Sequence, residues 1–251
     1  MRVAVFSDVH GNLTALEAVL ADIAAQAVDQ IYFAGDLCLI GPRPAACLER
    51  VRSANIAAVY GNTDDWILGR QTPPAPLQPL CDWTLAQLTA VQRSWLDAIP
   101  FSQQCNPTEN PADDLLVVHA NPQDVNQLVF PPEAEQVAQY GRLRQSDSAL
   151  ETLFANVTPQ VVAYGHLHIP SVRQLGTLTL ANISSVNMAG DGDERAKYGL
   201  FSWDGNAWQL ELRRVAYDAQ AEIDAYRQMQ PPGWENFVSQ IEQHGCVPQN
   251  V

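Results

Sequence analysis

The sequence predicts an α/β fold built as a single domain of 251 residues. The first observation behind this prediction is that short apolar runs alternate with segments of helical period through residues 2–60, as in βαβ units. The second is that the chain after residue 170 contains closely spaced strand-like runs with a hairpin signal at Asp204-Gly205, which indicates antiparallel strands. Those runs lie near 171–175, 177–182, 199–203 and 207–215.

The first βαβ unit has the clearest pattern. Residues 2–7 are an apolar, β-branched run that predicts a strand buried on both faces. Leucines, valine and isoleucine then recur at helical spacing over 13–23, behind the possible cap Asn12, and 31–34 predicts the next strand. The unit repeats with a helix over 45–54 and a strand over 56–60.

Two long stretches interrupt this alternation. We expect residues 66–105 to form an insertion, or cap, because four prolines fall within 72–79 and one amphipathic helix follows over 85–96. Residues 120–145 show few periodic signals and are interpreted as a lid. The tryptophans at 66, 83 and 95 could stack a nucleobase, but amphipathic helices usually bury such side chains in the core.

The remaining elements complete the domain. A strand at 115–118, a helix near 146–156 and a strand at 161–164 are expected before the antiparallel half. Helices over 218–229 and 234–244, separated by Pro231-Pro232-Gly233, form a C-terminal extension at 218–246. This extension could cover a sheet edge or form the contact of a homodimer, so the oligomeric state stays open.

Composition narrows the classes of function. The net charge of −14 disfavours long nucleic acid as a partner, although a small phosphorylated substrate remains compatible because bound dications can reverse the local field. Five cysteines without paired spacing indicate reduced thiols and hence a cytoplasmic protein. No apolar run has the length of a signal-peptide core or a membrane span, so we expect no membrane association.

Polar, metal-ligating side chains follow five of the apolar runs at the point where each run ends. Four of the five histidines fall in these segments, and the exception is His244. Strand ends of an open α/β sheet meet at one edge, so these oxygens and imidazoles should lie together. A mixed set of nitrogen and oxygen ligands suits zinc, iron, manganese, cobalt or nickel. The segments are Asp8-Val9-His10-Gly11-Asn12, Gly35-Asp36, Gly61-Asn62, Val118-His119 and Gly165-His166-Leu167-His168.

The set DVHGN, GD, GN, VH and GHLH, in this order and spacing, resembles the calcineurin-like metallophosphoesterases, and GDLCLIGPRP and GHLHIP resemble the bacterial phosphodiesterase-like branch. The resemblance implies a four-layer αββα sandwich of two packed mixed β-sheets flanked by helices. It also implies two divalent transition-metal ions, with manganese first and iron, zinc, nickel or cobalt as alternatives. The implied ligands are Asp8, His10 and His168 for one metal, Asn62, His119 and His166 for the other, and Asp36 as the bridging carboxylate.

The function implied is a metal-dependent phosphoesterase, most nearly a phosphodiesterase that hydrolyses small phosphodiesters or nucleotides by attack of a metal-bridging hydroxide. The catalytic set is Asp36, Asn62, Thr63 and Asp64. Thr63 departs from the family, which usually has a histidine there that contacts phosphate and helps to protonate the leaving group. Threonine cannot act as that acid, so Asp64 or a metal-bound water is the expected substitute.

Two alternatives to the phosphodiesterase remain open. One is a metal-binding interaction scaffold, because the retromer subunit with the family fold also lacks the motif histidine. The other is a protein phosphatase. The roles of three basic side chains also stay open: Arg43 could contact a phosphate or only solvent, and Arg195 and Lys197 could fold over the site or lie in a surface turn.

Overall fold

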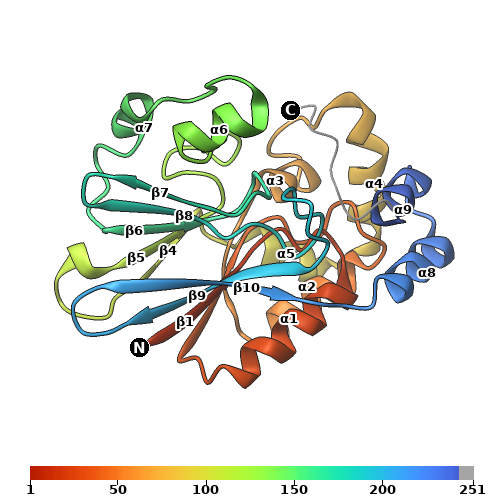
Figure 1. The fold of residues 1–251 in the computed structure, drawn as a ribbon. Helices are drawn as coiled ribbons and strands as arrows, with labels where there is room; N and C mark the ends of the chain where they lie inside the picture. Colours follow the sequence, from red (N-terminus) through yellow and green to blue (C-terminus); the bar gives the residue numbers. More distant parts are fainter. Residues whose placement is uncertain (243–251) are drawn as a thin grey trace.

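The computed structural model describes residues 1–242, which fold into two five-stranded sheets packed face to face between helices (Figure 1). The first sheet has the order β10-β9-β1-β2-β3, in which β1, β2 and β3 run parallel and β9 and β10 are antiparallel additions. Its strands are β1 (Arg2–Phe6), β2 (Gln30–Ala34), β3 (Ala57–Val59), β9 (Ala196–Trp203) and β10 (Trp208–Val215).

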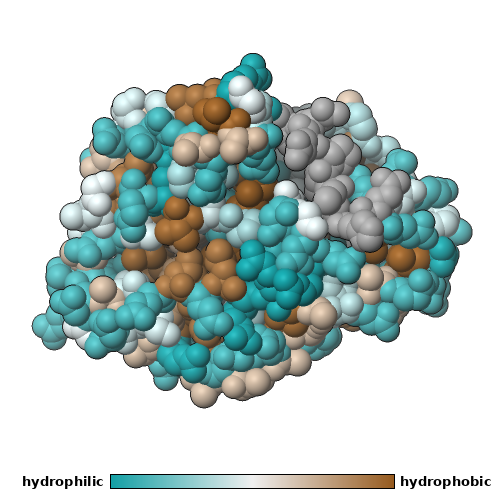
Figure 2. Space-filling model, viewed as in Figure 1, coloured by the Kyte–Doolittle hydropathy of each residue, from teal (hydrophilic) through white to brown (hydrophobic). Residues whose placement is uncertain are grey.

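The second sheet has the order β4-β5-β6-β8-β7. Its three central strands are parallel, and an antiparallel strand closes each edge. The strands are β4 (Ser102–Cys105), β5 (Leu115–Val118), β6 (Val161–Tyr164), β7 (Ser171–Leu175) and β8 (Leu178–Asn182). Apolar side chains gather left of centre in Figure 2.

Helices occupy the two outer layers. The α-helices are α1 (Leu13–Ala25), α2 (Pro44–Ser53), α3 (Asn62–Ile67), α4 (Gln78–Gln87), α5 (Ala90–Asp97), α6 (Glu133–Tyr140), α7 (Asp147–Leu153), α8 (Ala219–Met229) and α9 (Trp234–Glu242). Short 3₁₀ turns lie at η1 (Ala75–Leu77) and η2 (Pro111–Asp113). Helix α1 begins as predicted, because the Asn12 side chain accepts a hydrogen bond from the Ala15 amide at 2.9 Å.

Three apolar clusters separate these layers. Val5, Ala34, Val117 and other inward residues of both sheets form the cluster between the sheets. The opposite face of the first sheet packs on α1 and α2, and that of the second sheet packs on residues such as Leu150 of α7. Because alternate strand residues enter different clusters, each parallel strand is buried on both faces. The predicted four-layer αββα sandwich is confirmed.

The expected insertion differs from the prediction in two places. The single helix predicted over 85–96 is wrong: α4 ends before Leu88, and a new helix starts at Thr89. The Thr89 hydroxyl accepts from the Gln92 amide at 3.2 Å, while the Gln92 side chain accepts from the Thr89 amide at 3.0 Å, a capping box that the apolar period concealed. Residues 102–105 also belong to the second sheet, as β4. The three tryptophans of this region pack against the core, as predicted.

Residues 121–147, which include nearly all of the predicted lid at 120–145, are held by buried polar groups, and from here on we use the name lid for 121–147. Arg173 of β7 is 2% exposed, and its guanidinium donates to the backbone carbonyls of Phe130, Pro131 and Gln145 and pairs with Asp147. The buried Gln136 side chain adds hydrogen bonds at both its amide nitrogen and its oxygen. Because polar contacts rather than an apolar face hold this segment, its sequence shows no regular spacing of apolar residues.

The C-terminal helices α8 and α9 pack on each other, and α8 also packs on α1 (Figure 1). Buried Glu222 of α8 accepts from Thr14 and pairs with Arg43, so Arg43 fastens α8 rather than meeting only solvent. The final residues of the predicted helix at 234–244 and of the extension at 218–246 lie outside the described residues. Within residues 1–242, no helix combines the length and apolar character that a membrane span requires.

Candidate metal centre

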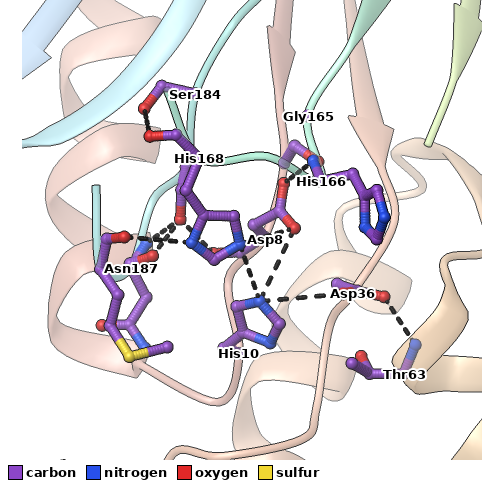
Figure 3. A network of polar contacts seen from close by, with 12 residues as sticks. Asp8, His10, Asp36, Thr63, Gly165, His166, His168, Ser184 and Asn187 are labelled. Carbon is purple, nitrogen blue, oxygen red and sulfur yellow. Dashed lines mark hydrogen bonds and ion pairs between the residues drawn. The ribbon is translucent and has the colours of Figure 1, made fainter. Parts of the chain in front are cut away.

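The strand ends of both sheets deliver all seven predicted ligands to one place. Asp8 and His10 follow β1, Asp36 follows β2, Asn62 follows β3, His119 follows β5, and His166 and His168 follow β6. In Figure 3 the side chains of His10 and His168 turn toward Asp8, and His10 also faces Asp36. Six of the predicted ligands form two groups in which the ligand atoms lie within 4.8 Å of one another, namely Asp8, His10 and His168, and Asp36, His119 and His166.

Asp8, His10 and His168 form the first half-site. The His168 Nε2 atom lies 3.1 Å from Asp8 Oδ1 and 3.2 Å from His10 Nε2, and His10 Nε2 lies 3.6 Å from Asp8 Oδ1. Asp8 and His10 are buried, and the His168 side chain is 13% exposed. One carboxylate oxygen and two imidazole nitrogens therefore face a single point.

Asp36, Asn62, His119 and His166 form the second half-site. His119 Nε2 lies 2.9 Å from Asn62 Oδ1, 3.1 Å from His166 Nδ1 and 3.5 Å from Asp36 Oδ2. The same Asp36 oxygen lies 3.8 Å from His10 Nε2 of the first half-site. The Asp36 carboxylate is thus placed between the two groups, where one side chain can contact both metals.

These separations fit metal ligands. Ligand atoms about 2.1 Å from one ion at angles of about 90–110° stand roughly 3.0–3.4 Å apart, whichever of the transition metals is bound. Most of the distances within each half-site fall near this range. A ring N–H can donate to a neighbouring ring nitrogen at these separations, and an ion in each half-site would hold the same atoms at the same separations.

Strained backbone conformations hold the ligands in place. Five of the seven have positive φ angles, which cost non-glycine residues free energy and cluster at functional sites; they are Asp8, His10, Asp36, His166 and His168. Two motif glycines are needed for close approach. A Cβ at Gly61 would collide with the Asp36 carboxylate, and a Cβ at Gly165 would collide with the Asp8 carboxylate.

Charge and burial set the protonation of the ligands. Burial opposes ionisation of Asp8, but His168 and His10 outweigh it and leave the pKa of Asp8 well below its usual value. Burial and the neighbouring His119 lower the pKa of His166 to about 4, so this imidazole is neutral at neutral pH. Burial lowers the pKa of the His119 imidazole, whereas the nearby Asp36 carboxylate raises it. The result is a pKa above the usual value for histidine. An ionised carboxylate and a neutral imidazole are the metal-binding forms.

Backbone carbonyls orient three of the four histidine rings from behind. His119 Nδ1 contacts the Ala34 carbonyl at 2.9 Å, His168 Nδ1 contacts the Met188 carbonyl at 3.0 Å, and His166 Nε2 contacts the Asn126 carbonyl at 2.9 Å. Because a carbonyl can only accept, each of these nitrogens carries the proton. The other ring nitrogen, which faces the half-site, keeps its lone pair for a metal ion.

Thr63 and Asp64 begin helix α3 next to Asn62 but occupy different positions. The Thr63 amide donates to Asp36 Oδ1 at 2.9 Å, and the buried Thr63 hydroxyl has no hydrogen-bond partner among the described residues. Asp64 is fully buried and accepts from the amides of Asp36, Leu37 and Gly61. Burial and the nearby Asp36 raise the pKa of Asp64 to about 6, against these three amides. Asp64 therefore holds the backbone of the site.

The carbonyl partners of the histidines were missed by sequence reasoning, since a backbone group has no residue-type signal. The sequence contained one indirect indication of residues that support the site. Polar side chains at the end of β8 and just after it, from Asn182 to Asn187, occupy the same place relative to a strand as the candidate ligands do. In the structure Ser185 donates to the Asp8 carbonyl, and Asn187 accepts from Asn12. Both contacts brace the loop that carries Asp8 and His10.

The fold and this centre define a phosphoesterase, and the family comparison agrees. A model of the calcineurin-like phosphoesterase superfamily domain matches residues 1–206, so the chain belongs to that family. The chain is therefore a hydrolase that acts on phosphoric ester bonds, in a metal-dependent family, with two candidate metal-binding groups.

Similar proteins span nearly the whole chain. A metallophosphoesterase from Sphaerobacter thermophilus is 27% identical, with a TM-score of 0.74, over 98% of this chain and 100% of that one. A hypothetical protein from Pyrococcus horikoshii shares the fold, with 16% identity and a TM-score of 0.77, over 94% of this chain and 97% of that one. An uncharacterised protein of Methanocaldococcus jannaschii is 28% identical over 254 residues, covering 92% of this chain and 94% of the relative.

Proposed function

We propose that the chain is a cytoplasmic two-metal phosphodiesterase that hydrolyses small phosphodiesters or nucleotides. The observation that carries this proposal is the position of the Asp36 carboxylate, whose Oδ2 atom lies 3.5 Å from His119 and 3.8 Å from His10. One carboxylate shared by two ligand groups is the arrangement that holds two dications close together. We propose manganese as the first choice among the divalent transition metals.

The proposed ligand roles divide along the two half-sites. Asp8, His10 and His168 would hold one ion, Asn62, His119 and His166 the other, and Asp36 would bridge them. When bound, the two ions lower the pKa of water and polarise the phosphoryl oxygens. Asn62 adds a ligand without adding charge, and the Thr63 amide fixes the free oxygen of Asp36 at 2.9 Å, so the bridge cannot rotate away.

Thr63 supports the preference for diesters. Its unpartnered, buried hydroxyl can donate one hydrogen bond to a phosphoryl oxygen, but it cannot supply a proton to a leaving group. Asp64, the other candidate acid, has both of its oxygens engaged by backbone amides. Substrates whose leaving groups depend least on protonation should therefore react best.

Metal reconstitution tests the proposal. The chain would be stripped with a chelator and supplied with manganese, zinc, nickel or magnesium singly, and hydrolysis of an activated diester would be compared with that of the matching monoester. We expect turnover that requires a transition metal, favours the diester, and is lost in Asp36→Ala and His119→Ala. Stoichiometric metal binding without turnover of either ester would instead support an interaction scaffold.

Position 63 offers a second test. Thr63→His restores the residue type that the family usually has, and general acid catalysis typically contributes about 10²–10⁴-fold. We expect hydrolysis of an ester with a poor leaving group to rise by about tenfold or more relative to that of the activated ester, so the ratio of the two rates should increase. The matched control is Thr63→Val, which removes only the hydroxyl and should lower the rates for both esters. An unchanged ratio in Thr63→His would refute the role assigned to Thr63 in substrate preference.

A further inference from the structure

The loop between β8 and β9 holds His168 at three points. The Met188 carbonyl accepts from His168 Nδ1 at 3.0 Å, while the Ser184 hydroxyl and the Gly190 amide both donate to the His168 carbonyl at 2.8 Å. We refer to residues 184–195 as the strap. Through these contacts the strap sets both the tautomer and the direction of the imidazole that faces the first half-site.

The two parts of the strap are supported differently. Val186 and Ala189 of its first part are buried, whereas its distal part, residues 190–195, reads GDGDER, and a strongly hydrophilic area lies over it to the right of centre in Figure 2. A glycine-rich acidic segment of this kind loses much conformational entropy on folding and repels itself. A specific anchor is therefore needed to hold the distal part, whose Gly190 amide donates to the His168 carbonyl.

Lys197 supplies that anchor. Its side chain is 1% exposed, and Nζ donates to the Asp193 carbonyl at 2.6 Å and the Arg195 carbonyl at 3.1 Å and pairs with Asp191 Oδ1 at 2.9 Å. The Lys197 amide also donates to the Ser185 carbonyl at 3.0 Å, next to the start of the strap. An ammonium group has three donors, and all three are used on the strap.

Two comparisons indicate that this lysine is specialised. Lys197 is the one lysine among 251 residues that contain 14 basic side chains. Burying an ammonium group is costly unless every donor is satisfied, so a basic residue without this task would remain at the surface. Arg195 does so: its side chain is 48% exposed and pairs with Asp193 of the same loop.

We infer that Lys197 is a positioning residue for the first metal: it clamps the strap so that the Met188 carbonyl fixes the His168 ring with Nε2 toward Asp8 and His10. This inference rests on the proposed two-metal function. Lys197 acts on the metal through the strap, which contacts His168 and the Asp8 carbonyl of the first half-site, and the second half-site has no contact with Lys197 among the described residues.

The effect of the clamp can be isolated one half-site at a time. In a His119→Ala background the first half-site keeps all its ligands, and in a His168→Ala background the second does. The affinity of apo-protein for Co²⁺ or Mn²⁺ would be measured by calorimetry in each background, with and without Lys197→Met. Loss of an outer-shell partner typically costs about 10–100-fold in metal affinity. We therefore expect Lys197→Met to weaken metal binding by this factor in the His119→Ala background. In the His168→Ala background it should change the affinity by less than about twofold.

Two further variants keep the test interpretable. Asp191→Asn removes one partner of Lys197 with less risk to folding and should weaken the same half-site by a smaller factor. Arg195→Ala, which removes an exposed cation from the same loop, should leave both affinities unchanged. If the parent proteins bind no metal, the proposed function and this inference both fail. If they bind metal and Lys197→Met weakens both half-sites equally or neither, the inference alone is overturned.

Discussion

The two half-sites present similar ligands to a metal but are supported by different parts of the molecule. In the first, the outer nitrogen of His168 meets the strap, which Lys197 clamps onto the sheet with its buried ammonium group. In the second, the outer nitrogen of His166 meets the carbonyl of Asn126, an exposed residue of the lid. One ligand is thus braced by a buried cluster and the other by a surface loop.

The Asn126 side chain extends that difference. Its amide donates to Gln71 Oε1 at 2.9 Å, and Gln71 in turn donates to Asp65 of helix α3. A chain of hydrogen bonds from exposed Asn126 through half-buried Gln71 to buried Asp65 therefore joins the lid, the predicted cap region and the helix that carries Asn62. Since hydrogen bonds at the surface open more readily than buried ones, we expect the second half-site to be the more labile of the two.

The largest effect should come from Arg173, which holds the lid. Arg173→Met leaves three backbone carbonyls without their donor. It should therefore destabilise the folded lid by about 2–4 kcal/mol. Hydrogen exchange followed by mass spectrometry should show loss of protection across 121–147, and calorimetry should show weaker metal binding at the second half-site. The control is Arg50→Met, which removes an exposed ion pair with Glu17. Equal weakening of both half-sites by Arg173→Met would contradict the comparison.

Metal removal should expose the same asymmetry in the native chain. We expect a chelator to release cobalt in two phases, with the ion of the second half-site leaving about tenfold faster because its outer-shell support opens more often. Absorbance of bound cobalt would follow the release. His168→Ala and His166→Ala should each retain a single phase, which assigns the fast phase to the second half-site and the slow phase to the first. A slower release from the second half-site would reverse our interpretation.

The smallest expected effect concerns the amide bridge. Asn126→Ala removes one neutral hydrogen bond while keeping the Asn126 carbonyl, and such a bond contributes about 0.5–1.5 kcal/mol, or roughly 2- to 10-fold. Gln71→Ala removes the same bond together with the one to Asp65. We expect an acceleration in this range for release from the second half-site alone. Gln123→Ala is the matched control, because its side chain in the same loop donates to the Leu153 carbonyl instead. A similar acceleration in Gln123→Ala would show that the hydrogen bond between Asn126 and Gln71 has no specific role in metal release.

The convergence of the candidate metal ligands was predictable because strand-end position is encoded in residue type. Asp8, Asp36 and His119 each follow an apolar run, and the topology of two mixed sheets brings those ends together. The four-layer fold followed from the resemblance, and the apolar strands agree with it because both faces of each parallel strand meet a core cluster. The structure places Thr63 and Asp64 next to each other at the site, and their roles remain proposals.

What the sequence concealed is carried by backbone groups and buried polar side chains. The carbonyls of Met188 and Asn126 orient two ligands, and no residue type marks them. The break between α4 and α5 depends on a capping box at Thr89 inside an otherwise continuous apolar period. Arg173 and Lys197 look like surface charges in the sequence, because only the fold reveals which carbonyls surround them.

Titration of metal-free protein with manganese, with bound metal and diester hydrolysis measured in the same samples, tests the central claim most directly. The two half-sites joined by Asp36 predict two ions per chain and hydrolysis that rises only as the second equivalent binds. Full activity at one equivalent, or two bound ions without hydrolysis of any diester, would contradict the two-metal phosphodiesterase.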